Sequence, residues 1–258
     1  MRITCLVENT ASDAHLGAEH GLSLYIETAQ HRILFDMGQT ALFAENAQKL
    51  GIDLSLVDLA VLSHGHYDHG GGLPTFLQLN CHAPVYIHRN AFEPHYNGTE
   101  KYIGLDPALQ SEGRLIFTDD VHLLANGLTL YACNERPKIV EMGSFGLNVQ
   151  RGNEFYPDDF RHEQYLEICE NGKNVLISGC SHKGILNIAA WFRPDVLVGG
   201  FHFSKLPLDG TLKSYAAQLA QYPTRFYTCH CTGAEQFAFM RNEMTRLSYL
   251  ACGDRIDI

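Results

Sequence analysis

Four residues with metal-binding side chains lie within six positions of the chain: His64, His66, Asp68 and His69. Histidine accounts for only 14 of the 258 residues, so chance is a poor explanation of this spacing. Imidazole nitrogens and carboxylate oxygens suit Zn²⁺, Mn²⁺ and iron. Gly65 and the glycines at 70–72 allow the backbone to turn tightly, so that the four side chains converge. The pattern predicts a metal site, and a hydrogen-bonded polar loop is the alternative.

Three further residues with metal-binding side chains lie where predicted strands begin or end: His162, Cys180 and His230. His162 has an ordinary explanation as a surface or capping residue, and Cys180 as a small buried hydrophobe. Cys229 and Cys231 flank His230 and suggest a structural zinc site, but the chain has no second cysteine pair at a suitable spacing. We therefore favour His230 as a ligand and interpret the two cysteines as packing residues.

The elements predicted around these residues alternate strands and helices. Hairpins are predicted at 22–36 and 165–178, the second turning at Asn171-Gly172, and single strands at 59–62, 196–198 and 225–228. Helices are predicted at 40–50, 73–79, 182–192, 211–220 and 234–244. The segments near 88–120 and 132–161 show no clear period, and we expect them to be irregular and to form the rim of an active site. No repeat or linker divides the chain, which favours a single α/β domain over residues 1–258.

Composition disfavours several classes of protein. The 258 residues carry a formal net charge of −10 and are 45% hydrophobic, which fits a folded domain and argues against a nucleic-acid partner. No apolar run approaches the roughly 20 residues that a membrane-spanning helix needs, and the first residues are too weakly apolar for a secretory signal. We therefore expect a cytoplasmic protein with no membrane partner, either monomeric or oligomeric. The eight cysteines follow no regular framework and are expected to be reduced.

The segment from His64 to Leu73, HGHYDHGGGL, resembles the metal-binding motif of the metallo-β-lactamase superfamily. Within it, the chain resembles the branch of dihydropterin-methyl-ribofuranosyl-aminobenzene phosphate synthase-like proteins. Supporting segments occur in the family's order and cover nearly the whole chain, at 19–23, 34–38, 162–164, 179–185, 199–202 and 230–233. The resemblance implies a four-layer αββα sandwich with a metal site at one edge of its two sheets.

The resemblance also implies which residues bind metal. His64, His66 and His162 would bind one ion, Asp68, His69 and His230 a second, and Cys180 would bridge the two. Cys180 is a departure, because most hydrolases of the superfamily carry Asp at this position, and His182 is the alternative ligand in the segment. The implied cofactors are two divalent ions, Zn²⁺ with Mn²⁺ or iron as alternatives. No organic cofactor is expected.

Two cations about 3.5–4 Å apart lower the pKa of a shared water to near 7, so the resemblance implies a hydrolase that uses a metal-bound hydroxide. We expect Asp68 to orient this nucleophile and accept its proton. His202 and His182 are expected to contact the substrate or its developing oxyanion, with a satisfied strand-end histidine as the alternative for His202. Asp36 is expected to fix the tautomer of a ligand. Arg151 would help to bind a small anionic metabolite such as a phosphoester.

Two other functions stay open. The branch resemblance implies a transferase that joins a dihydropterin-methyl diphosphate to an aminobenzene ribotide and releases pyrophosphate. Aromatic residues such as Tyr96, Tyr102 and Phe155 would stack on such a heterocycle, or would only pack the loops. A metal-containing binding or sensor protein with a vestigial site is the alternative from a different functional class.

Overall fold

The computed structural model describes residues 1–258, which form two compact units. The first unit is built from Met1–Asp119, Ser144–Gln164 and Ala251–Ile258, and the second from Asp120–Gly143 and Tyr165–Leu250. Each unit contains one seven-stranded sheet with its own helices. The predicted α/β class is therefore confirmed, whereas the expectation of a single domain stays a prediction.

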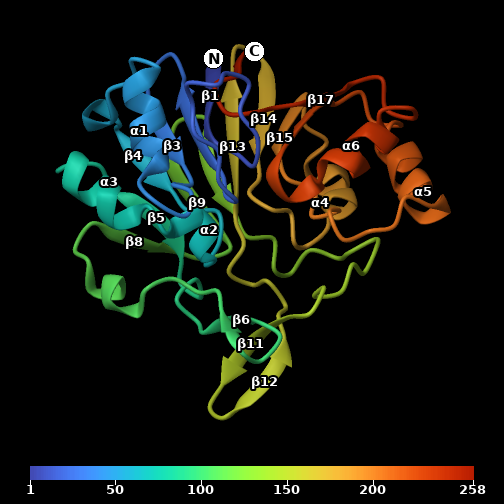
Figure 1. Ribbon diagram of the computed structural model, residues 1–258, viewed down its shortest axis with the longest axis horizontal. Helices are drawn as coiled ribbons and strands as arrows, with labels where there is room; N and C mark the ends of the chain where they lie inside the picture. Colours follow the sequence, from blue (N-terminus) through green and yellow to red (C-terminus); the bar gives the residue numbers. More distant parts are fainter. The chain divides into compact units, whose positions relative to one another are not determined.

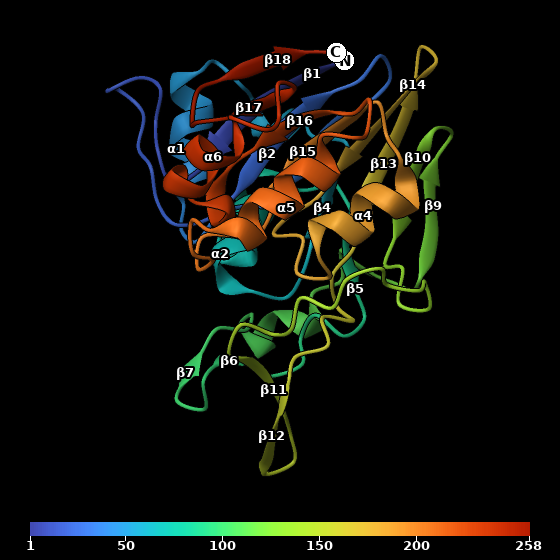
Figure 2. The same cartoon turned by 90° about the vertical axis from the view of Figure 1, so that its right-hand side faces the viewer.

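The sheet of the first unit pairs strands from both ends of the chain with the strands that precede the histidine motif (Figures 1 and 2). In spatial order its strands are β18 (Arg255–Asp257), β1 (Arg2–Val7), β2 (Ser23–Glu27), β3 (Arg32–Phe35), β4 (Leu59–Val61), β5 (Val85–His88) and β8 (Leu115–Thr118). Strands β3, β4, β5 and β8 run parallel to one another. The carboxyl ends of β3 and β4 consequently meet at one edge of the sheet.

Two helices of the first unit, α1 (Leu42–Lys49) and α3 (Leu73–Leu79), cover one face of this sheet (Figure 1). Phe43 of α1 and Phe76 of α3 share an apolar core with side chains of the sheet. Gly72, just before α3, lies so close to the preceding loop that a Cβ atom would be 2.2 Å from the carbonyl oxygen of Met37. A glycine is therefore required where α3 begins.

The first unit has three further short helical elements. They are α2 (Tyr67–Gly70) and the 3₁₀ helices η1 (Leu54–Leu56) and η2 (Pro107–Ser111).

The sheet of the second unit is covered by the three remaining α-helices of the chain. In spatial order its strands are β17 (Leu247–Tyr249), β16 (Arg225–Thr228), β15 (Val196–Gly199), β14 (Lys173–Ile177), β13 (Tyr165–Glu170), β10 (Leu128–Tyr131) and β9 (Val121–Ala125). Strands β14 to β17 are parallel. The helices are α4 (Ile185–Phe192), α5 (Gly210–Leu219) and α6 (Ala234–Met240), and Ile188, Leu212 and Met240 anchor them to the apolar core of this unit. A short 3₁₀ helix, η3 (His230–Thr232), follows β16.

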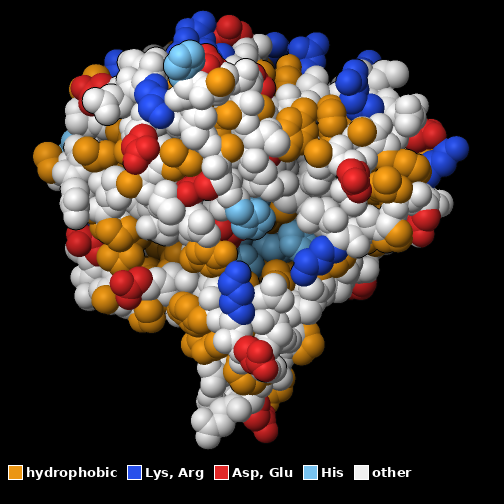
Figure 3. All heavy atoms as spheres, in the orientation of Figure 1, with side chains coloured by type: hydrophobic (Ala, Val, Ile, Leu, Met, Phe, Trp, Pro, Cys, Tyr) orange, Lys and Arg blue, Asp and Glu red, His pale blue; other side chains and the backbone are white.

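The two segments that we expected to be irregular contain a second, smaller sheet of the first unit. Its strands are β12 (Glu154–Pro157), β11 (Leu147–Arg151), β6 (His95–Asn97) and β7 (Lys101–Tyr102). The hairpin of β11 and β12 projects away from the seven-stranded sheet of the same unit (Figures 1 and 2), and it carries hydrophobic and acidic side chains (Figure 3). These strands are two to five residues long, too short to produce a visible period, and β6 pairs with a strand about fifty residues away.

Most predicted boundaries agree with the structure, and the exceptions have local causes. Asn171 and Gly172 both have positive φ, 52° and 72°, as the predicted hairpin turn requires. Helix α4 begins at Ile185 instead of residue 182, because Gly184 has a φ of 94° that no helix accommodates. Helix α6 ends at Met240, before the predicted end at residue 244. No helix combines the length and apolar character needed to cross a bilayer.

Replacing Asn46 with alanine is expected to destabilise the first unit. The buried Asn46 amide donates to the carbonyls of Leu6 and Gly17, at 2.7 and 2.9 Å, and accepts from the Gly17 amide at 3.0 Å. Asn46→Ala leaves these groups unsatisfied, so the free energy of unfolding should fall by about 2–3 kcal/mol. Denaturant unfolding measures this, with the exposed Gln48→Ala as a control that should change it by less than about 0.5 kcal/mol. Equal stability of the two variants would contradict the expectation.

Candidate metal site

The histidine motif lies directly after β4, and its side chains converge within the first unit. His64 follows the strand, His66 precedes the short helix α2, and Asp68 and His69 lie on that helix. The ring centroid of His64 lies 4.5 Å from that of His66 and 4.2 Å from that of His69. All four side chains are buried. The turn therefore gathers three imidazoles and a carboxylate away from bulk water.

Gly65 is the residue that makes this turn sterically feasible. A Cβ atom at Gly65 would lie 2.0 Å from the carbonyl oxygen of Ala91, so any other residue would force the two backbones apart. The amide of Gly65 donates a hydrogen bond to Nδ1 of His162 at 2.9 Å. The motif is thereby linked to a histidine almost one hundred positions later in the chain.

The segment that carries His162 is held against the end of β4 by Gln164. The Gln164 amide donates to the carbonyl of Ser63, and its side chain donates to the carbonyl of Leu62, both at 2.8 Å. The side-chain oxygen of Gln164 accepts from the hydroxyl of Thr118 at 2.7 Å. Because Gln164 is fully buried, these bonds fix the position of His162 relative to the motif.

The buried carboxylate of Asp36, at the end of β3, sets the proton positions of two motif histidines. It accepts hydrogen bonds from the amide and the hydroxyl of Ser63 and from Nδ1 of His69, each at 2.7 Å. A carboxylate can only accept, so the Ser63 hydroxyl gives its proton to Asp36 and accepts in turn from Nδ1 of His64 at 2.8 Å. The rings of His64 and His69 therefore both carry the Nδ1 proton. Nε2 is then the nitrogen through which each ring can bind a metal.

Burial and neighbouring charges act on the protonation of the motif. Burial, reinforced by the nearby His162 and His95, lowers the pKa of His66 well below its ordinary value. His66 is therefore neutral at pH 7, and neutral imidazole is the form that binds metal. Burial also lowers the pKa of His69, but the adjacent Asp36 carboxylate outweighs this effect and raises the pKa.

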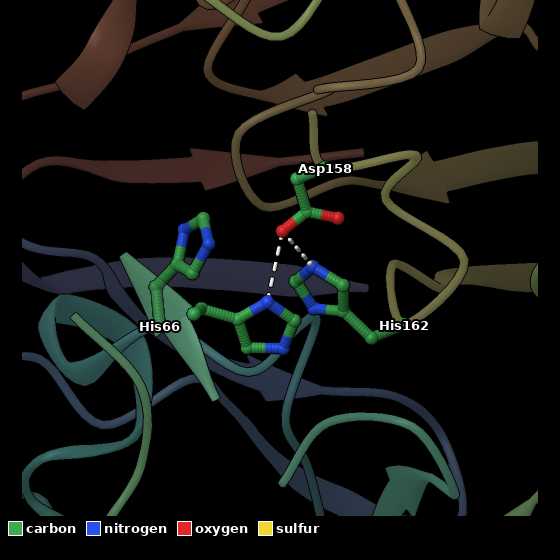
Figure 4. Close-up of side chains that lie close together, drawn as sticks. His66, Asp158 and His162 are labelled. Carbon is green, nitrogen blue, oxygen red and sulfur yellow. Dashed lines mark hydrogen bonds and ion pairs between the residues drawn. The ribbon is translucent and has the colours of Figure 1, made fainter. Parts of the chain in front are cut away.

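A group of four buried side chains extends the motif within the first unit. The potential ligand atoms of His66, His95, Asp158 and His162 all lie within 4.8 Å of one another. Oδ2 of Asp158 lies 2.8 Å from Nδ1 of His95 and 3.4 Å from Nε2 of His162. Figure 4 shows the Asp158 carboxylate facing His162, with His66 nearby. The ring centroids of His95 and His162 are 3.9 Å apart.

Two members of this group, His95 and Asp158, were not predicted as site residues from the sequence. His95 lies on the three-residue strand β6, and Asp158 follows β12, so both lie in the segments that lack a period. The one available signal was the Asp158-x-x-x-His162 spacing. Burial raises the pKa of the Asp158 carboxyl, but His162 and His95 outweigh it and hold the pKa well below its usual range. Asp158 is therefore ionised.

Two polar contacts surround the motif in the first unit. Oδ2 of Asp68 lies 3.3 Å from Nε2 of the largely exposed His20 and 3.9 Å from Nε2 of His69. Arg151, predicted to contact an anionic substrate, lies on β11 and forms an ion pair with Asp159 at 3.5 Å. Its role toward a substrate stays a prediction.

The remaining predicted residues lie in the second unit, at the carboxyl ends of its parallel strands. Cys180 follows β14, His202 follows β15, and His230 follows β16. The carboxyl ends of parallel strands are where α/β sheets commonly bind ligands. The ring centroids of His182 and His202 lie 4.3 Å apart. The structure therefore groups these predicted residues along one edge of the second sheet.

One thiol that we interpreted as packing belongs to the same edge. The potential ligand atoms of Cys180, His230 and Cys231 lie within 4.8 Å of one another, and all three residues are buried. The Cys231 thiol donates to the carbonyl of Cys180 at 3.4 Å. Cys229 is not in this group and is fully buried, as expected for a packing residue.

Backbone strain accumulates at the strand ends of both units. Asp36, Ser181, His202 and His230 all adopt left-handed backbone conformations, with φ of 59°, 60°, 54° and 48°. Each costs about 1–3 kcal/mol for a residue other than glycine, and such strain concentrates at functional sites. The donor types of the predicted ligand residues are imidazole nitrogen, carboxylate oxygen and thiol. They fit Zn²⁺ and, apart from the thiol, Mn²⁺ or iron.

Replacing Asp36 with asparagine is expected to weaken metal binding. One oxygen of the carboxylate accepts from the Ser63 amide, and the other accepts from both the Ser63 hydroxyl and Nδ1 of His69. An asparagine side chain must place its NH2 group, which only donates, against the donors on one of these two sides, so the hydrogen bonds that orient the rings are disturbed. The affinity for Zn²⁺, measured by competition with a chromophoric chelator, should fall about 10–100-fold. Asp58→Asn is the control, because the exposed Asp58 accepts only from the Arg32 amide. An unchanged affinity in Asp36→Asn would mean that Asp36 serves only the fold.

Comparison with known proteins identifies the family. The profile of the Metallo-beta-lactamase superfamily matches residues 16–219. The chain is 30% identical to the uncharacterized protein MJ0448 of Methanocaldococcus jannaschii, with 90% of each chain covered. It is 27% identical to the 7,8-dihydropterin-6-methyl-4-(beta-D-ribofuranosyl)-aminobenzene-5'-phosphate synthase of the same organism, covering 90% of this chain and 88% of the synthase.

A solved structure supports the same assignment. The crystal structure of Tm1679, described as a metal-dependent hydrolase of the beta-lactamase superfamily, matches 100% of this chain and 99% of its own, with a TM-score of 0.84 and 29% identity. This similarity confirms the predicted metallo-β-lactamase-like sandwich fold. The chain therefore belongs to the metallo-beta-lactamase superfamily.

Proposed function

We propose that the protein is a metal-dependent hydrolase that acts on a small anionic metabolite, such as a phosphoester. The observation that carries this proposal is the Asp36 network, which holds the protons of His64 and His69 on Nδ1 and leaves Nε2 for a metal. The similarity to Tm1679, itself described as a metal-dependent hydrolase, supports the same reaction class.

The proposed metal ligands follow the resemblance to the superfamily. They are His64, His66, Asp68, His69, Cys180 and His230, with Zn²⁺ as the proposed metal and two ions as the proposed number. For a third nitrogen ligand beside His64 and His66 the resemblance implies His162, whose ring lies 3.9 Å from that of His95. When bound, such cations acidify a water molecule and withdraw charge from a polarised oxygen.

Two residues of the chain are proposed to act directly in the reaction, one by accepting a proton and the other by stabilising negative charge on the substrate. Asp68, whose carboxylate is only 12% exposed and lies near His20, is proposed to orient the attacking water and accept its proton. His202, half-buried beside His182, is proposed to donate to the oxyanion that develops on the substrate. Its left-handed backbone is consistent with a residue held in place for function.

A local positive charge supports an anionic substrate. The ammonium group of Lys101 lies 3.5 Å from the hydroxyl of Tyr67, which follows His66 in the motif. This cation stands on the exposed strand β7 of a protein with a net charge of −10. The overall charge repels long polyanions, whereas a single cation beside the motif favours a small anion.

The second candidate function is a transferase that joins a dihydropterin-methyl diphosphate to an aminobenzene ribotide. The similarity to the synthase of Methanocaldococcus jannaschii favours it, since it extends over about nine tenths of both chains. Tyr96 contacts Phe155 and Tyr102 edge-to-face, with ring centroids 5.0 and 5.4 Å apart. In the structure these rings pack on one another. Stacking of the rings on a pterin is therefore proposed only as part of the transferase function. A metal-containing binding protein is the third candidate.

Product analysis separates the three candidates. The metal-loaded protein is incubated with a panel of small phosphoesters, and with a dihydropterin-methyl diphosphate together with an aminobenzene ribotide. We expect products in which water has displaced the leaving group. A joined pterin–ribotide product would instead establish the transferase. Absence of turnover with every compound would favour the binding protein.

Two histidine variants test the proposed division between metal binding and catalysis. His66→Ala should lose bound metal and all turnover, because a buried neutral imidazole is removed from the motif. His202→Ala should keep its metal while the rate falls about 10²–10³-fold, the usual effect of removing an oxyanion donor. Elemental analysis and steady-state kinetics measure both. Equal metal loss in the two variants would make His202 a ligand.

A further inference from the structure

His95 is a fully buried histidine of the first unit that neither the motif nor the resemblance uses. Its Nδ1 lies 2.8 Å from Oδ2 of Asp158. The ionised carboxylate only accepts, so the ring carries its proton on Nδ1 and its lone pair on Nε2. Nε2 of His95 is buried and has no hydrogen-bond partner. A buried nitrogen with an unsatisfied lone pair costs free energy unless a ligand occupies it.

His162 has the opposite arrangement. Its Nδ1 accepts from the Gly65 amide at 2.9 Å, so a neutral ring must carry its proton on Nε2. That nitrogen lies 3.4 Å from Oδ2 of Asp158. The 3.4 Å approach is not a hydrogen bond, and Nε2 of His162 is buried without a hydrogen-bond partner, as Nε2 of His95 is. The two rings differ in the proton: the lone pair of the neutral His162 ring is used by the Gly65 amide, so that its Nε2 offers a cation no lone pair.

Asp158 is fixed in the position that this arrangement requires. Its Oδ1 accepts from the Phe160 amide at 2.8 Å, while Oδ2 faces both His95 and His162. A carboxylate that holds the Nδ1 proton of a histidine is the usual outer partner of a metal-binding imidazole. Asp36 stands in the same relation to His69, so two carboxylates of this unit prepare Nε2 of two different rings.

We propose that His95, oriented by Asp158, binds the cation of His66 through Nε2, and that His162 is a positioning residue that binds no metal. The ligand atoms of this group lie within 4.8 Å of one another. Two nitrogen ligands at about 2.0–2.1 Å from one Zn²⁺ lie roughly 3.4 Å apart, so the rings of His66 and His95 would have to approach one another to share an ion. The inference rests on the proposed metal dependence and changes the ligand set that the resemblance implies.

Matched glutamine variants test this assignment. In His162→Gln, the amide oxygen can accept from Gly65 and the amide nitrogen can donate to Asp158, so both contacts of the histidine are retained. We expect His162→Gln to bind Zn²⁺ within about 10-fold of the wild-type affinity, and His95→Gln to lose at least about 100-fold. The exposed His82→Gln is the control for an unrelated histidine. Chelator competition gives the affinities, and elemental analysis gives the stoichiometry.

A measurement on the unmodified protein covers the case in which a variant does not fold. Nitrogen-15 correlation spectra of the histidine rings are recorded on the wild type before and after Zn²⁺ is added. Nε2 of His95 should shift by tens of parts per million on loading, whereas Nε2 of His162 should keep its proton.

The outcomes separate this inference from the proposed function. Wild-type affinity in His95→Gln, or a loss in His162→Gln as large as in His95→Gln, would overturn the inference while metal dependence stands. Loss of the Nε2 proton of His162 on Zn²⁺ loading would do the same. A wild-type protein that takes up no Zn²⁺ would overturn both.

Discussion

Two buried carboxylates, Asp36 and Asp158, decide which nitrogen each imidazole of the first unit can offer. Both are almost completely shielded from water, where an ionised carboxylate is unstable unless several donors satisfy it. Each is satisfied by backbone amides and histidine protons, so the free energy that stabilises the charge also fixes the rings. The arrangement of the histidines thus depends on charges that never need to touch a metal.

The same constraint explains why so many glycines and strained residues occur around the motif. Side chains as short as Asp and His converge only if the backbones that carry them approach closely. Gly65 provides this closeness beside Ala91, and the left-handed conformation of Asp36 turns its carboxylate toward Ser63. The strained backbone at Asp36 and the absence of a Cβ atom at Gly65 therefore both serve to bring the carboxylate and the imidazoles together.

Sequence reasoning found the features whose signal is local. The histidine motif, the Asn171-Gly172 turn and the helices that follow strands are all encoded within a dozen residues, and the resemblance added the αββα fold. The pairing of β6 with β11, and with it His95 and Asp158, could not be predicted, because strands of three to five residues leave no period and the partners are about fifty positions apart. Hydrogen-bond direction at His162 also lies beyond any spacing rule, since it depends on one backbone amide of the motif.

The path of the chain through its two units limits how this protein can have diversified. The chain passes between the units four times, and the first unit takes its last strand, β18, from the opposite end of the sequence to β1. Neither unit therefore corresponds to a continuous stretch of coding sequence. The shortest stretch that holds the whole second unit, residues 120–250, also holds Ser144–Gln164 of the first, so recombination of one gene block cannot exchange a whole unit without changing part of the other.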